Sequence, residues 1–267
     1  MTSDLIGRRI IVTGAGGGIG RVTSLLLAES GARLTLVDRD ESLLDETLRS
    51  VREAGGTAVA VSADVSDEND VDHCVSESLR AHHGIDGLFS NAGISGPIGP
   101  AAALNLADWD GVVAVNLRGM FLAVRKVLPE MIDARRGAIV CTTSIASTLG
   151  MPNTVAYNVT KHAVLGLVRT VAAETAGLGV RINAVAPGPI ATRMLDDMAV
   201  QFMPGLVHDP REAARRSASA MTPMGRLGEP REIGAVVRFL LSDEASYVTG
   251  ASFAVDGGAT ATGANGS

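Results

Sequence analysis

Short, continuous apolar runs alternate along the chain with longer segments in which apolar residues recur every three or four positions. The short runs predict strands at 9–13, 33–37, 58–62, 87–90, 138–143, 181–185 and 252–255. The periodic segments predict helices at 18–30, 41–54, 68–82, 108–133, 154–177 and 229–242. Strands without polar alternation are typical of a parallel sheet covered on both faces. We therefore expect an α/β fold with one doubly wound, seven-stranded parallel sheet and helices on both faces.

Composition excludes several classes of protein. Of the 267 residues, 46% are apolar and 19% are charged, which suits a single domain with one substantial core. The apolar runs are shorter than the ~20 residues of a membrane-spanning helix, and we expect no secretory signal. A net charge of −6 without a basic block argues against nucleic acid or membrane as partners. Cys74 and Cys141 are expected to be free, buried thiols of a cytoplasmic protein, and the histidines show no metal-ligand spacing.

A glycine-rich segment follows the first predicted strand. It reads Thr-Gly-Ala-Gly-Gly-Gly-Ile-Gly over residues 13–20 and fits T-G-x-x-x-G-x-G through Gly14, Gly18 and Gly20. Such glycines permit a tight turn and close backbone approach to a pyrophosphate, and the next helix points its N-terminus at the anion. The segment therefore predicts a dinucleotide site in a Rossmann-like domain spanning residues 1–258.

Acidic residues end the next two strands. Asp38 lies 18 residues beyond Gly20, near the ~20-residue offset of a carboxylate that binds the adenosine ribose. Its charge would repel a 2′-phosphate and favours NAD(H) over NADP(H), although the adjacent Arg39 could bind a phosphate. A solvated turn with a helix cap is the alternative for residues 38–40. Asp64, which precedes Val65, could accept from the adenine amino group or cap the next helix.

Polar side chains also gather between residues 141 and 161. Ser144 follows the fifth strand, and Tyr157 and Lys161 lie four residues apart on one face of the next helix. A phenol beside an ammonium should have a pKa below its usual value of about 10, which would allow proton transfer near neutral pH. A packed ring beside a solvated amine is the alternative. Asn116 interrupts an apolar helix and favours a local bend or a polar role over a merely buried amide.

Together these motifs resemble those of the short-chain dehydrogenase/reductase family, in the branch with chains near this length. The resemblance covers residues 7–258. The family's Asn, Ser, Tyr and Lys tetrad corresponds here to Asn116, Ser144, Tyr157 and Lys161. It implies that Tyr157 is the acid in carbonyl reduction and the base in alcohol oxidation. Lys161 would lower the pKa of Tyr157 and hold the nicotinamide ribose, Ser144 would position the substrate oxygen, and Asn116 would support a water linked to Lys161.

The resemblance also implies the cofactor contacts. Ser90 replaces the first Asn of the family's usual N-N-A-G, so the segment continues as Asn91-Ala92-Gly93. The backbone of Ile190 and the hydroxyl of Thr192 would meet the nicotinamide carboxamide. The residues expected to bind the cofactor are Gly14, Gly18, Ile19, Gly20, Asp38, Arg39, Asp64, Val65, Asn91, Ala92, Gly93, Tyr157, Lys161, Pro187, Gly188, Ile190 and Thr192.

The predicted activity is hydride transfer between NAD(H) and a secondary alcohol/ketone pair, and the apolar loop suggests a mostly apolar, cyclic small-molecule substrate. An NADPH-dependent 3-oxoacyl-thioester reductase is the alternative within the family, and Arg211, Arg215, Arg216 and Arg226 could supply its basic patch. A dinucleotide-binding protein without catalysis is the alternative from another class. It is less favoured because Tyr157 and Lys161 are both present. Relatives pair across twofold axes, which implies a homotetramer or homodimer.

The segment at about 189–225 differs in character from the rest of the chain. It is rich in methionine, broken by prolines, and longer than a usual connection. It predicts a lid that closes over the substrate, with a static pair of helices as the alternative. Residues 259–267 are small and predict a flexible tail.

Overall fold

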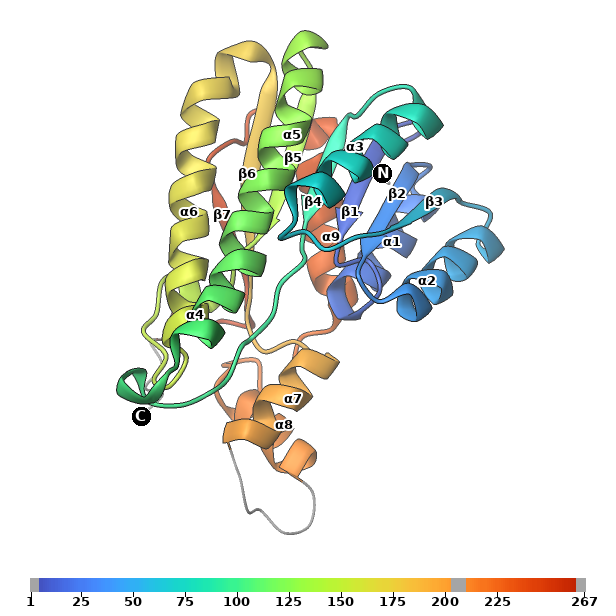
Figure 1. Cartoon of the computed structure of the whole chain (residues 1–267). Coiled ribbons are helices and arrows are strands. Elements are labelled where there is room, and N and C mark those ends of the chain that lie inside the picture. The colour runs from blue at the N-terminus through green and yellow to red at the C-terminus, as the bar shows by residue number, and fades with distance from the viewer. Residues whose placement is uncertain (1–4, 203–209, 263–267) are drawn as a thin grey trace.

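The computed structural model describes residues 5–202 and 210–262. At its centre is a seven-stranded sheet with the order β3-β2-β1-β4-β5-β6-β7 (Figure 1). All neighbouring strands pair in parallel, so the predicted doubly wound fold is confirmed. Every predicted strand is present, with ends within two residues of the prediction. The strands are β1 (Arg9–Thr13), β2 (Arg33–Asp38), β3 (Thr57–Ser62), β4 (Gly87–Ser90), β5 (Gly137–Thr142), β6 (Val180–Pro187) and β7 (Ser252–Val255).

Helices cover both faces of this sheet (Figure 1). They are α1 (Gly18–Glu29), α2 (Glu41–Glu53), α3 (Glu68–His82), α4 (Leu106–Val113), α5 (Met120–Asp133), α6 (Val155–Thr175), α7 (Arg193–Phe202), α8 (Pro210–Ala220) and α9 (Pro230–Leu241). The apolar cluster on one face takes residues from α1, α2 and α9, and the cluster on the other from α3, α5 and α6. Within the described residues, none of the helices has the length and apolar character needed to span a bilayer.

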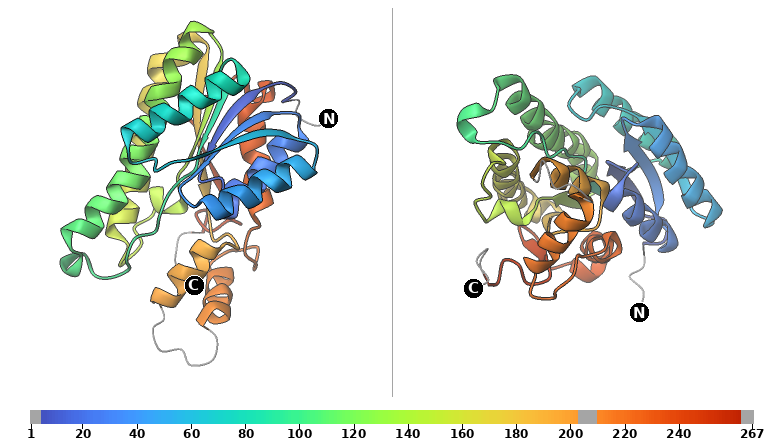
Figure 2. Two further views of the ribbon diagram at one scale, coloured as in Figure 1. Left: turned by 45° about the vertical axis from the view of Figure 1, so that its right-hand side comes forward. Right: turned by 90° about the horizontal axis from the view of Figure 1, so that it is seen from below.

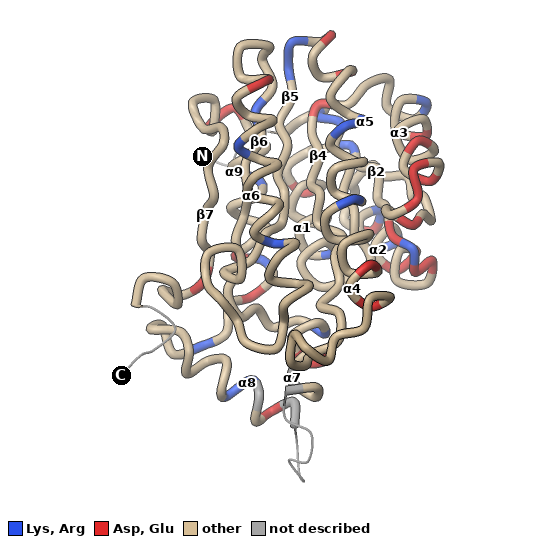
Figure 3. The backbone as a smooth tube through the Cα atoms, turned by 60° about the vertical axis from the view of Figure 1, so that its left-hand side comes forward, with Lys and Arg blue, Asp and Glu red and all other residues tan. Residues whose placement is uncertain are grey.

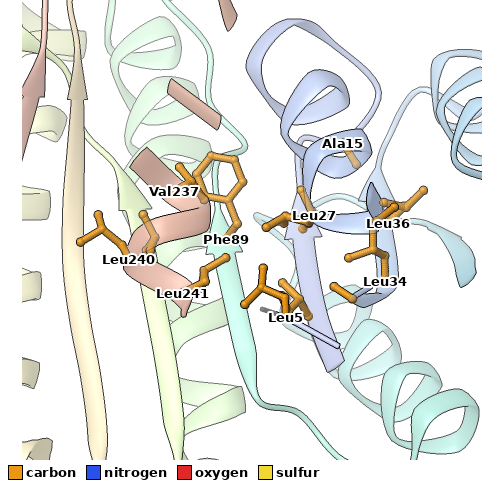
Figure 4. Packing of buried hydrophobic residues seen from close by; sticks show 14 of the residues in the cluster. Leu5, Ala15, Leu27, Leu34, Leu36, Phe89, Val237, Leu240 and Leu241 are labelled. Carbon is orange, nitrogen blue, oxygen red and sulfur yellow. The ribbon is translucent and has the colours of Figure 1, made fainter. Parts of the chain in front are cut away.

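The two apolar clusters hold the sheet in place. On one face, Leu27 of α1 and Val237 and Leu241 of α9 pack near Phe89 of β4 (Figure 4). Burying a side chain of this size contributes about 1.5–3 kcal/mol, so each cluster contributes more than any hydrogen bond at the strand ends. Cys141 lies in the second cluster; it and Cys74 are free and buried, as predicted.

The single helix predicted over 108–133 is interrupted. Between α4 and α5 the chain forms a π-helical turn, Ala114–Gly119, which contains the fully buried Asn116. A π turn within an α-helix re-aims side chains and often lies at a functional site. The helix is therefore irregular at the position where the sequence predicted a local bend or a polar role for Asn116.

The segment after β6 folds into a helical pair. Its helices α7 and α8 pack on each other and lie beyond the carboxyl ends of the strands (Figures 1 and 2). A two-point ion pair between Asp196 and Arg215, with both contacts at 2.8 Å, joins them. Residues 203–209, between these helices, lie outside the described part, as do residues 263–267 of the predicted tail. Within that tail, Ala259 is buried and the Thr260 hydroxyl donates to Asp256.

Candidate active site

The predicted site residues meet at the carboxyl ends of β1, β4, β5 and β6, where the strand order reverses. The hydroxyl of Thr13, at the end of β1, accepts hydrogen bonds from the backbone N–H groups of Asn91 (3.0 Å) and Ala92 (3.2 Å). These bonds fix the loop after β4 against the glycine-rich segment. The sheet therefore places the expected cofactor residues and the tetrad at the carboxyl ends of its strands.

The glycine-rich segment leaves no room for side chains. A Cβ on Gly14 would lie 2.9 Å from the Ala92 Cα, and one on Gly20 would lie 1.9 Å from the Gly14 carbonyl oxygen. Gly14 and Gly18 also have positive φ angles of 66° and 45°, which favour glycine. Helix α1 begins after Gly17 with no side-chain cap and no acidic residue in its first turn. Its first N–H groups and dipole suit an anionic pyrophosphate.

The Gly20→Ala substitution tests this close approach. Because the nearest atoms belong to the Gly14 backbone, they cannot rotate away, and we expect unfolding free energy to fall by about 1–3 kcal/mol with weakened cofactor binding. Thermal unfolding and cofactor titration measure the two effects. Gly17→Ala is the matched control, since a Cβ there meets nothing within 4 Å. Equal losses in both variants would contradict the prediction.

Asp38 and Asp40 have separate tasks. An oxygen of Asp38 accepts from the Gly16 N–H at 2.9 Å, which places its carboxylate beside the glycine-rich segment. Asp40 caps α2 by accepting from the N–H groups of Ser42 and Leu43. The helix cap that the sequence left as an alternative for 38–40 therefore belongs to Asp40, and Asp38 remains a candidate for the adenosine ribose.

Asp64 is held by its own turn. It accepts from the Ser66 N–H (2.9 Å) and hydroxyl (2.7 Å), and these bonds lower its pKa, with a smaller contribution from Arg39. The cap of α3 is Asp67, so the alternative in which Asp64 caps this helix is wrong. Val65 is buried, and its role toward adenine remains a prediction.

Asn91 joins three strand ends. Its amide nitrogen donates to the Gly14 carbonyl (3.2 Å), and its amide oxygen accepts from the Thr142 hydroxyl (3.1 Å). This side chain therefore bridges the strand ends. Nearby, a Cβ on Gly93 would lie 3.2 Å from the Asn116 amide oxygen and 3.6 Å from the Lys161 ammonium. Glycine at this position therefore lets the loop approach the tetrad.

The amide of Asn116 binds the loop after β4. Its oxygen accepts from the Ile94 N–H and its nitrogen donates to the Ile94 carbonyl, both at 2.8 Å. The π-helical turn thus points this side chain at a backbone segment. The water that family resemblance assigns to Asn116 remains a prediction.

Lys161 is almost fully buried, with 3% of its surface exposed. Its ammonium donates to the Thr142 carbonyl at 3.0 Å and lies 5.5 Å from the centre of the Tyr157 ring. Burial disfavours the charged form and lowers the pKa of Lys161 to about 8. The amine is therefore held at a fixed place between β5 and Tyr157.

The pKa of Tyr157 differs from the sequence prediction. Burial raises the pKa of the phenol above its ordinary value, and a hydrogen bond with Ser144 partly opposes that rise. The predicted fall of this pKa below its usual value is therefore wrong, because removal of the phenolate from water outweighs the hydrogen bond with Ser144. Ser144 is the protein group whose hydrogen bond favours the phenolate here.

The loop after β6 folds over the glycine-rich segment. A Cβ on Gly18 would lie 3.2 Å from the methyl group of Thr192. Ile190 is buried and forms a parallel bridge with Gly228, and a Cβ on Gly188 would lie 2.6 Å from the Asp256 Cα. The predicted residue Thr192 of this loop therefore lies against the glycine-rich segment, at Gly18.

Sequence reasoning missed Thr13 and Thr142, whose oxygens organise the site. Their signal was a hydroxyl residue at the carboxyl end of an apolar strand. It also missed Ile94, whose backbone alone takes part, so no side-chain signal could have identified it. In the described part of the chain, no three His, Cys, Asp or Glu side chains are grouped as metal ligands would be.

Comparisons with known proteins cover nearly the whole chain. A family model described as "Enoyl-(Acyl carrier protein) reductase" matches residues 14–260. Levodione reductase of Leifsonia aquatica is 41% identical over 97% of each chain. A structure titled crystal structure of levodione reductase is 40% identical and superimposes with a TM-score of 0.93, covering 97% of this chain and 99% of that one. A structure titled NAD+-bound xylitol dehydrogenase has a TM-score of 0.88 at 35% identity, with 95% and 99% covered.

Other similar proteins differ in their named substrates. Cis-4-hydroxycyclohexanecarboxylate dehydrogenase of Sinomonas cyclohexanicum is 39% identical, covering 95% of this chain and 97% of that protein. Cyclohexanol dehydrogenase of an Acinetobacter species is 35% identical, with 97% and 98% covered. A 3-oxoacyl-[acyl-carrier-protein] reductase of Thermotoga maritima is 36% identical, with 95% and 98% covered.

Proposed function

Since the chain belongs to the short-chain dehydrogenase/reductase family, we propose that it interconverts an alicyclic secondary alcohol and its ketone with NAD(H). The observation that carries the proposal is the position of Ser144, Tyr157 and Lys161 beside the glycine-rich segment. Ser144 forms a hydrogen bond with the phenol of Tyr157, and Lys161 lies under the same ring. Such an arrangement can bind a carbinol oxygen and transfer a proton to or from it.

The roles of the side chains follow from this geometry. A bound nicotinamide supplies or accepts the hydride. The Ser144 oxygen accepts from the Ala146 N–H at 3.1 Å, so its own proton is available to a substrate oxygen or to Tyr157. Tyr157 takes the hydroxyl proton in oxidation and returns it in reduction. Lys161, fixed by the Thr142 carbonyl, favours the phenolate and can bind ribose hydroxyls.

The proposal that the substrate contains an alicyclic ring is supported by the names of similar proteins. Two of the relatives are named for hydroxyl groups on a cyclohexane ring. Helix α7 exposes Met194 and Val200, and Met221, directly after α8, is also exposed. Methionine adapts to apolar shapes without fixed geometry, which suits a saturated ring better than a sugar. We propose that this helical pair is a lid over the substrate and that residues 1–258 form a single catalytic domain.

The choice of NAD(H) is supported by Asp38. Its carboxylate lies beside the glycine-rich segment, where it would accept from ribose hydroxyls and repel a 2′-phosphate. We expect Asp38→Asn to reduce the preference for NAD+ over NADP+ in kcat/KM about tenfold or more, because the charge is lost while the shape is kept. Asp45→Asn, on the exposed surface of α2, is the control. An unchanged ratio would contradict the assignment.

The alternatives have less support. Docking of an acidic carrier protein would need free basic residues, yet Arg215 pairs with Asp196, Arg216 with Glu212 and Arg226 with Glu232. Figure 3 shows both signs of charge along α7 and α8. Arg211 has no described side chain. The presence of both Tyr157 and Lys161 argues against a non-catalytic dinucleotide-binding protein.

A substrate panel tests the proposed function. Purified protein is given NAD+ or NADP+ with cyclohexanol, cis-4-hydroxycyclohexanecarboxylate, xylitol and a linear secondary alcohol, and nicotinamide absorbance is followed. We expect turnover with NAD+ and the ring alcohols. Turnover only with NADPH and a 3-oxoacyl thioester would overturn the proposal in favour of the acyl reductase. Cofactor binding without turnover on any substrate would favour the non-catalytic alternative.

We also propose that the protein is a cytoplasmic homo-oligomer, with a homotetramer as the expected form. The support is the exposure of two large apolar side chains, Leu106 of α4 and Phe121 of α5, which contact between subunits would bury. Light scattering should give a multiple of the 27.4 kDa chain mass. A monomeric mass at micromolar concentration would contradict this proposal.

A further inference from the structure

Asn158 lies directly after Tyr157 on α6, and only 8% of its surface is exposed. One end of its amide faces two carbonyl oxygens, those of Ala146 and Leu149, each at 2.8 Å, and the other faces the Met151 N–H at 3.0 Å. The end that faces two acceptors must be the nitrogen. Asn158 therefore satisfies three backbone groups of the loop that connects Ser144 to α6.

One of these contacts leads directly to the catalytic hydroxyl. The Ala146 peptide accepts from Asn158 through its carbonyl, and its N–H donates to the Ser144 oxygen at 3.1 Å. Ala146 has no exposed surface, so this peptide has no room to rotate. The Asn158 amide thus fixes the peptide that orients the hydroxyl of Ser144.

A second tie lies on the other side of Ser144. Lys161 donates to the carbonyl of Thr142, two residues before Ser144, while Asn158 binds Ala146, two residues after it. The helix that carries Tyr157 therefore forms hydrogen bonds with the chain on both sides of Ser144. Loss of either bond would let the Ser144 hydroxyl move relative to the Tyr157 phenol.

We propose that Asn158 is a positioning residue that sets the Ser144–Tyr157 hydrogen bond by holding the Ala146 peptide against α6. This role rests on the proposed acid–base function of Tyr157, but its structural part does not depend on turnover. Without Asn158, Ser144 should favour the phenolate less. The phenol would then ionise at higher pH, as it would if Ser144 itself were removed.

A double-mutant cycle tests the proposal in steady-state alcohol oxidation. We expect Asn158→Ala and Ser144→Ala each to lower kcat about tenfold or more, with KM for NAD+ unchanged, and to move the rising limb of the kcat pH profile upward. Because both act on one hydrogen bond, Asn158→Ala should cost little more once Ser144 is alanine. The proposal would be overturned if the effects of the two substitutions on kcat multiplied in the double variant. It would also be overturned if the kcat pH profile of Asn158→Ala equalled that of wild type. Val159→Thr, exposed on the same helix, is the control.

Hydrogen exchange separates this proposal from the proposed function. In the protein without substrate, Asn158→Ala should speed exchange of the Met151 amide, which Asn158 binds, while the amides of β5 keep their protection. Asn158→Asp keeps the acceptor for the Met151 N–H but loses both donors, and it serves if the alanine variant fails to fold. It should restore Met151 protection without restoring kcat. Unchanged Met151 exchange in Asn158→Ala would overturn the proposal even if no substrate were turned over.

Discussion

Tyr157→Phe is expected to lower kcat for alcohol oxidation by roughly 10²- to 10⁴-fold, the usual contribution of a positioned proton-transfer group. The substitution removes one oxygen and leaves the ring that packs near the Lys161 ammonium. Cofactor binding should therefore change little, because the glycine-rich segment and Asp38 are untouched. Stopped-flow or steady-state absorbance of the nicotinamide gives kcat, and fluorescence titration gives the cofactor dissociation constant.

The chain contains its own control for this substitution. Tyr247 is the second of two tyrosines and is fully exposed, so Tyr247→Phe removes the same atom where no site residue is nearby. It should leave kcat within twofold of wild type, a difference of about 0.4 kcal/mol. Retention of activity by Tyr157→Phe would identify another group as the acid or base. Loss of cofactor binding in that variant would place the phenol in the cofactor site alone.

The strands and the tetrad could be predicted because their signals are local. The apolar run of three residues before Thr13, or a Tyr and a Lys four positions apart, can be interpreted within one element. The bend at Asn116 was predictable for the same reason, since a lone amide in an apolar helix has few uses. Resemblance to a family then joined these local signals into one site.

The missed features depend on contacts between distant segments. Whether Asp64 or Asp67 caps α3 is decided by a shift of three residues, and both positions suit an Asp cap. The pKa of Tyr157 follows from how deeply the phenol is buried, which no spacing of residues encodes. The helices α7 and α8 are the pair of helices that the sequence left as the alternative to a lid, and the ion pair of Asp196 with Arg215 that joins them had no signal in the sequence.

Lys161→Met is expected to change activity and stability in opposite directions. Methionine has nearly the same length and no charge, so the variant should lose roughly 10²-fold or more in kcat, because no cation supports the phenolate. The same change removes an ammonium that is 3% exposed and has one hydrogen-bond acceptor, the Thr142 carbonyl, among the described contacts. Since a buried charge with few partners is costly, the variant should unfold at a higher temperature at pH 7.

The pH dependence of that stability difference distinguishes burial from other causes. The pKa of Lys161 is about 8 in the folded protein and about 10.4 in an unfolded chain. Between these values the unfolded state binds the extra proton, so the stability of the wild-type protein rises with pH relative to the variant. The advantage of Lys161→Met should therefore be full below pH 8 and shrink as the pH approaches 10. Chemical denaturation at several pH values measures it.

Lys126→Met is the control for both readouts. Lys126 pairs with Asp72 at 2.6 Å and Glu68 at 3.3 Å on the surface of α5 and α3, far from the tetrad along the sheet. Its loss should leave kcat unchanged and lower stability by at most about 1 kcal/mol. If Lys161→Met proved less stable than wild type at pH 7, the buried ammonium would be a net stabilising group. The Thr142 carbonyl contact would then outweigh desolvation, and Lys161 would hold β5 to α6 as much as it supports Tyr157.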